Sequence, residues 1–123
     1  MNPVRLILDA SAVAAYPSVA VGELIGEIHD EGGTFGVPAA ALVSAASNGV
    51  DNVRLLTQHE AFVALDLTGD NWQQVAVTLG LVGGSIGAAH AVIATEMFDC
   101  DILTAEPDVY ASLGDDPPVI PID

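Results

Sequence analysis

Positive charge is almost missing from this chain. Its 123 residues include no lysine, and two arginines, Arg5 and Arg54, face 17 acidic residues, for a formal net charge of −15. Nucleic-acid binders gain affinity by neutralising phosphates with Lys and Arg, so we expect the chain by itself to repel RNA, DNA and anionic lipid. Two interpretations of the acidity stay open: a solvated surface, or a face that binds a basic partner protein.

Cysteine, aromatic residues and unbroken apolar runs are also scarce. The lone Cys100 excludes an internal disulfide framework, and no Cys/His spacing indicates zinc. The longest apolar stretch, 79–93, contains four glycines and His90, so we expect no membrane span. Asp9 interrupts the first apolar stretch too early for a signal peptide. These features predict a single domain, 1–123, in the reducing cytoplasm.

Short apolar segments alternate along the chain with amphipathic ones, which favours an α/β fold. Such alternation predicts a three-layer α/β/α domain around a mostly parallel sheet of about five strands. We expect Ser11 and Thr68 to cap helices, Pro17 to end the first helix, and Asp70 to lie in a first helical turn. Strands are predicted at 5–9, 34–37, 61–67, 102–104 and 119–122, and helices at 10–16, 18–30, 38–46, 52–59, 69–81, 86–98 and 107–113.

Acidic side chains follow two of these strands. Asp9 ends the first strand, and Glu106 and Asp108 follow the strand at 102–104. Parallel strands present their carboxyl ends at one edge of the sheet, where ligands bind in open α/β folds. Carboxylate oxygens are the ligands that Mg²⁺ prefers. The pattern therefore predicts a cation site at this edge.

Four segments, taken in order, resemble the PIN domain, and in particular the VapC-like members of bacterial toxin–antitoxin pairs. They are Ile7–Ser11, Val37–Ala45, Ala88–Ala91 and Ile102–Glu106. The resemblance spans nearly the whole chain, and it is the order and spacing of the segments that carry it. It implies the fold of an Mg²⁺- or Mn²⁺-dependent ribonuclease, often dimeric and often inhibited by a small DNA-binding antitoxin.

The resemblance carries over unevenly to the acidic positions. Asp9 matches the first acid of the family, whereas Ser44 and Gly87 stand where the family has a glutamate and an aspartate. Glu106 stands at another aspartate position, one methylene longer, and Asp108 could add a carboxylate. One acid is thus unaltered, one is replaced by its homologue and two are missing.

The depleted acidic set decides what we expect the protein to do. Phosphodiester cleavage needs a cation that polarises the phosphate and activates a water. Asp9, Glu106 and Asp108 could hold Mg²⁺ or Mn²⁺ only weakly, or hold no metal. We therefore expect a degenerate VapC-like PIN domain that is a binding or regulatory module and a homodimer, with a basic antitoxin or another basic protein as partner. The alternatives are an active Mg²⁺/Mn²⁺ ribonuclease toxin that binds RNA, and an acidic module in which the site has no role.

Each site residue also has a purely structural interpretation. Asp9 could simply cap the helix that follows it. Glu106 and Asp108 stand at a helix start, where the helix dipole favours acids. His90 lies in an apolar helix and is expected to be a hydrogen-bonded packing residue.

Overall fold

A five-stranded sheet forms the centre of the molecule in a computed structural model that describes residues 3–16 and 18–122. The strand order is β3-β2-β1-β4-β5, and every neighbouring pair is parallel. The predicted α/β class and strand number are confirmed, and the predicted helix end at Pro17 lies outside the described residues. The strands are β1 (Val4–Leu8), β2 (Thr34–Pro38), β3 (Phe62–Leu65), β4 (Asp101–Thr104) and β5 (Val119–Pro121).

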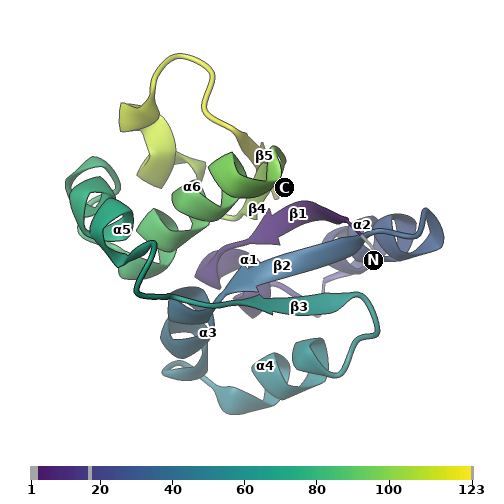
Figure 1. Cartoon of the computed structure of the whole chain (residues 1–123). Helices are drawn as coiled ribbons and strands as arrows, with labels where there is room; N and C mark the ends of the chain where they lie inside the picture. The colour runs from purple at the N-terminus through teal and green to yellow at the C-terminus, as the bar shows by residue number, and fades with distance from the viewer. Residues whose placement is uncertain (1–2, 17, 123) are drawn as a thin grey trace.

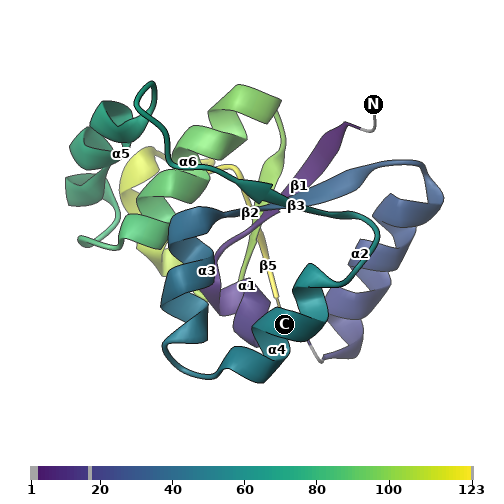
Figure 2. The ribbon, with the colours of Figure 1, turned by 60° about the horizontal axis from the view of Figure 1, so that its bottom comes forward.

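Helices cover both faces of this sheet, which gives the three layers (Figure 1). One face carries α1, α2 and α4, and the other carries α5, α6 and η2. Helix α3 follows β2 and packs against both α1 and α6 near the carboxyl ends of the strands (Figure 2). The helices are α1 (Ala10–Ala14), α2 (Val19–Asp30), α3 (Ala39–Ala46), α4 (Val50–Thr57), α5 (Trp72–Thr78) and α6 (Ile86–Phe98), with 3₁₀ turns η1 (Leu79–Leu81) and η2 (Pro107–Leu113).

The central strand β1 shows why two helical layers are needed. Leu6 and Leu8 belong to the core shared with α1 and α2, whereas Ile7 between them belongs to the core shared with α5 and α6. Successive side chains of a strand point to opposite faces. Three consecutive apolar side chains in a strand therefore need cover on both sides of the sheet, as the sequence predicts.

Helices α1 and α6 and the turn η2 begin at the residues that the sequence predicts, whereas α5 begins later than predicted. Ser18 caps α2 and Ser85 caps α6 through their hydroxyl oxygens. The predictions for Ser11 and Thr68 are wrong. The side chain of Asp9, rather than Ser11, caps α1, which confirms the structural interpretation of Asp9 as a helix cap. Residues 68–71 instead form a turn, in which the Thr68 N–H donates to Asn71 Oδ1 at 2.7 Å, so α5 begins only at Trp72 and has no acid in its first turn.

A glycine turn separates α5 and η1 from α6. Gly83 and Gly84 have φ of 66° and 80°, in the left-handed region that favours glycine. Among the described residues, no single helix is long and apolar enough to cross a membrane. Only the pair Trp72–Leu81 and Ile86–Phe98 meets that length and composition when taken together, and it is bent by 116°.

Helices α3 and α6 approach each other closely at Gly87. A Cβ atom placed there would lie 3.2 Å from the Cα of Ala41 and 3.5 Å from its backbone nitrogen. Both residues are buried, and the obstacle is backbone rather than a flexible side chain. The absence of a side chain at position 87 therefore serves the packing of these two helices.

This contact yields a prediction about stability, using Gly22 on the exposed side of α2 as the matched site. An added Cβ at Gly22 meets nothing within 4 Å. Gly22→Ala should raise the free energy of unfolding by up to ~1 kcal/mol because alanine is the better helix former. Gly87→Ala should be less stable than Gly22→Ala by about 1–3 kcal/mol because α3 must move. Urea unfolding measures both, and an equal gain at the two sites would contradict the close approach.

Candidate functional site

The carboxylate of Asp9 accepts three hydrogen bonds at the carboxyl edge of the sheet. It is 6% exposed. Its Oδ1 accepts hydrogen bonds from the Ser11 hydroxyl at 2.6 Å and the Ala12 N–H at 3.0 Å, and its Oδ2 accepts one from the Tyr110 hydroxyl at 2.7 Å. Asp9 therefore joins the end of β1, the start of α1 and the 3₁₀ turn η2.

Tyr110 is the least expected member of this group. Its side chain is 0% exposed, and it packs in the core beneath α6. Burial, and then the charge and the hydrogen bond of Asp9, raise the pKa of the Tyr110 hydroxyl well above its usual range. The phenol is therefore a fixed donor to Asp9.

A second set of hydrogen bonds ties α1 to the end of β4. The Ser11 hydroxyl oxygen accepts the Ala105 N–H at 2.9 Å and lies 3.2 Å from Thr104 Oγ1. Thr104 Oγ1 in turn accepts the Glu106 N–H at 3.0 Å. These bonds hold the chain after β4 close to the chain after β1, although more than ninety residues separate them.

Asp9, Ser44 and Glu106 meet around one hollow of about 240 Å³. The sequence placed all three at this edge, and they come from the ends of β1 and β4 and from α3. Asp108 is exposed and lies outside the residues that line this hollow, and Gly87 faces Ala41 instead. The remaining lining residues are Ala10, Ser11, Ala14, Asn48, Ser85, Ala88 and Val109.

The donor set of this hollow does not fit a pair of metal ions. Among the described residues, Asp9 and Glu106 are the carboxylates that line it, and Ser44, Asn48 and Ser85 add neutral oxygens. A carboxylate has about four lone-pair sites, and Asp9 already accepts three hydrogen bonds. Among residues 3–16 and 18–122, no group of three or more His, Cys, Asp or Glu side chains is arranged to hold a metal ion.

Sequence reasoning missed Tyr110, Asn48 and Ser85. Tyr110 is the only tyrosine in the last third of the chain, and nothing local marks it as a partner of a residue one hundred positions away. Ser85 could have been found, because Gly83, Gly84 and Ser85 mark the start of a helix, and this helix carries Ala88–Ala91, one of the four segments that resemble the PIN domain.

No family model matches the chain, and no curated protein matches it either.

His90 is buried, as predicted, but it lies away from the hollow. It is 2% exposed, and its Nδ1 has no hydrogen-bond partner within the described part of the chain, so the expected hydrogen bond is missing at this atom. Burial lowers the pKa of His90, while a backbone hydrogen bond with Asp66 and the charge of its carboxylate act in the opposite sense. The imidazole is part of the wall of a separate, larger cavity.

The Asp9–Tyr110 contact predicts a specific loss of stability. Tyr110→Phe removes the one donor to Asp9 Oδ2 among the described residues and leaves a buried carboxylate short of that hydrogen bond. We expect the free energy of unfolding to fall by about 1.5–3 kcal/mol. Tyr16→Phe is the control, because it also removes a tyrosine hydroxyl but not one bonded to Asp9. Urea unfolding at pH 7 checks the difference, and equal effects of the two changes would contradict the central role of this bond.

Proposed function

We propose that this chain is a PIN-like protein that has lost metal-dependent nuclease chemistry and serves as a binding module for a basic partner protein. The proposal rests on the α/β/α fold, the quoted sequence resemblance and the chemistry of the hollow at Asp9. Its strongest support is the state of Asp9, whose carboxylate is engaged by three protein donors. A catalytic metal ligand needs lone pairs that point to the cation, and here three of the about four lone-pair sites of the carboxylate are engaged by the protein.

The composition supports the same conclusion. A nuclease must attract a polyanion, and Arg5 and Arg54 are the only Lys or Arg residues in the chain. Neither arginine lines the hollow. RNA would therefore approach two carboxylates with no nearby positive charge to offset the repulsion.

The hollow has instead the chemistry to receive an arginine side chain of a partner. The exposed Glu106 carboxylate can accept a charge-assisted hydrogen bond from a guanidinium. Ser44, Asn48 and Ser85 add neutral oxygens around it. The volume of about 240 Å³ lies below the usual 300–1,000 Å³ of sites for drug-sized ligands, which favours a single side chain as occupant.

One observation favours a working ribonuclease as the second candidate. Asp9 and Glu106 share one hollow at the carboxyl ends of β1 and β4, and a single Mg²⁺ can be held by one or two carboxylates together with water. In that case Glu106 would hold the cation, and Asp9 would supply its one remaining lone-pair site.

An RNA-cleavage assay separates the two candidates. We expect the protein with Mn²⁺ to cleave single-stranded RNA no faster than Asp9→Ala does, because the site lacks the ligands for metal-assisted hydrolysis. Cleavage that requires Mn²⁺ and disappears in Asp9→Ala would establish the nuclease and overturn the proposal. Circular dichroism confirms that the variant is folded.

A restoration variant shows that the assay can detect a repaired site. Ser44→Glu with Ser85→Asp adds two carboxylates to the hollow, and aspartate keeps the helix cap at position 85. We expect Mn²⁺ to bind this variant at least ~tenfold more tightly than the original chain. Gln58→Glu with Gln73→Glu adds the same charge at exposed positions elsewhere and should change affinity far less. Equal effects of the two pairs would mean that the hollow is not a metal-site remnant.

Binding of a short arginine-rich peptide tests the proposed partner chemistry. Glu106→Gln should weaken binding about tenfold at 150 mM salt, the loss expected for one charge-assisted contact. Glu23→Gln is the charge-matched control on the exposed side of α2 and should alter affinity less than about twofold, because screening weakens distant charges. Equal losses would indicate general attraction to an acidic protein. Isothermal titration calorimetry measures both.

A further inference from the structure

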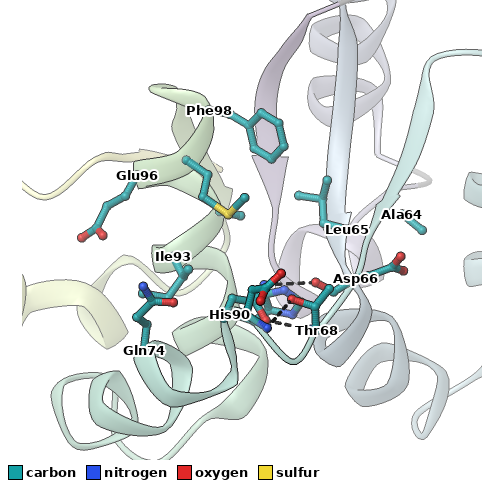
Figure 3. Close-up of a pocket in the computed structure, with 13 residues that line it drawn as sticks. Ala64, Leu65, Asp66, Thr68, Gln74, His90, Ile93, Glu96 and Phe98 are labelled. Atoms are coloured by element: carbon teal, nitrogen blue, oxygen red, sulfur yellow. Dashed lines mark hydrogen bonds between the residues drawn. The ribbon is translucent and has the colours of Figure 1, made fainter.

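A cavity larger than the hollow at Asp9 has no role in the proposed function. It has a volume of about 640 Å³ and shares no lining residue with the hollow at Asp9. It lies between the end of β3, the turn at 66–71 and the helices α5 and α6 (Figure 3). Its volume is within the range of sites that hold small organic ligands.

One end of this cavity is apolar and open. Figure 3 shows Phe98 and Leu65 facing each other across it, with Ile93 further along α6. Met97, which also lines the cavity, is 64% exposed, and Phe98 is exposed as well. A ligand with an aromatic or aliphatic body would cover these side chains, and a thioether makes favourable contacts with aromatic rings.

The charged groups around the cavity all have the same sign. Asp66, Asp70 and Glu96 line it, and neither arginine of the chain does. All three carboxylates are exposed, so each contributes modestly by itself. Together they favour a cationic ligand over a neutral or anionic one.

His90 adds a specific polar group at the base of the cavity, where Figure 3 shows it close to Asp66 and Thr68. A neutral imidazole has one N–H donor and one bare acceptor nitrogen. Burial lowers the pKa of this imidazole, while a backbone hydrogen bond with Asp66 acts in the opposite sense. Nδ1 has no partner among the described residues. A buried acceptor without a donor is costly, and because Nδ1 is closed off from solvent, the imidazole has to rotate toward the cavity for an N–H group of a ligand to satisfy it.

We propose that this cavity binds a small organic ammonium ion with an aromatic or aliphatic body. The ammonium group lies among Asp66, Asp70 and His90, where it donates to the imidazole and to carboxylate oxygens. The body of the ligand lies against Leu65, Ile93 and Phe98. This site is independent of the Asp9 hollow, so either assignment can fail without the other.

The test uses the full chain with 2-phenylethylamine, which is protonated at neutral pH, and its neutral counterpart 2-phenylethanol. Nuclear magnetic resonance follows the Met97 methyl group, the Phe98 ring and the His90 ring during titration. We expect saturable shifts at all three residues with the amine, and at least ~tenfold weaker binding of the alcohol, the value of one charge-assisted hydrogen bond. Equal affinities, or shifts that avoid these residues, would overturn the proposal.

Variants separate the cavity from general attraction to an acidic protein. Asp66→Asn should weaken amine binding at least ~fivefold, whereas Glu23→Gln, with the same change in net charge, should leave it within about twofold. His90→Phe should weaken it as much as Asp66→Asn. Because His90 is buried and its replacement could unfold the protein, Met97→Arg provides a second test at an exposed position. It places a cation at the cavity and should abolish binding of the amine.

A competing occupant would be a second copy of the chain. If the protein self-associates in sedimentation equilibrium and Met97→Arg makes it monomeric without any amine binding to the original chain, the cavity is an association surface and the proposal is wrong. A monomer that binds the amine and loses it in Met97→Arg supports the assignment.

Discussion

The buried carboxylate of Asp9 is the group on which the functional edge of this molecule depends. Asp9 follows β1 and accepts hydrogen bonds from the Ser11 hydroxyl, the Ala12 N–H and the Tyr110 hydroxyl. It therefore caps α1 and holds η2 against the end of β1. The same bonds that give the edge its order occupy the lone pairs that a cation would need. Hydrogen bonding within the protein and metal binding therefore compete for the lone pairs of the Asp9 carboxylate. In this chain three of them already accept hydrogen bonds from the protein.

The second constraint is the near absence of positive charge. The chain has 17 acidic residues and two basic ones, and burying many of these negative charges together would destabilise the fold by mutual repulsion. The described structure keeps nearly all of them exposed, and Asp9 is the one acidic residue that it buries. The two concave sites share this negative character but differ in size and lining: one is small and rich in hydroxyl groups, and the other is larger and mostly apolar. They suit different ligands for that reason.

Local patterns predicted some helix boundaries correctly and missed others. Helix α6 begins and ends where the sequence predicts, since Ser85 caps its first turn and the apolar run continues to Phe98. The start of α5 was missed because Thr68 and Asn71 form a turn whose hydrogen bonds compete with a cap. Periodicity locates an element better than it locates the end of one.

What the sequence determined by itself is the layered α/β architecture and the convergence of Asp9 and Glu106, because parallel strands with polar carboxyl ends allow few other arrangements. Only the tertiary structure decided that Tyr110 binds Asp9, that Gly87 lies against the backbone of Ala41, and that Nδ1 of His90 has no partner among the described residues. Each of these depends on how elements far apart in the chain pack against one another. Such packing is set by side-chain shape across a shared core, and no local pattern encodes it.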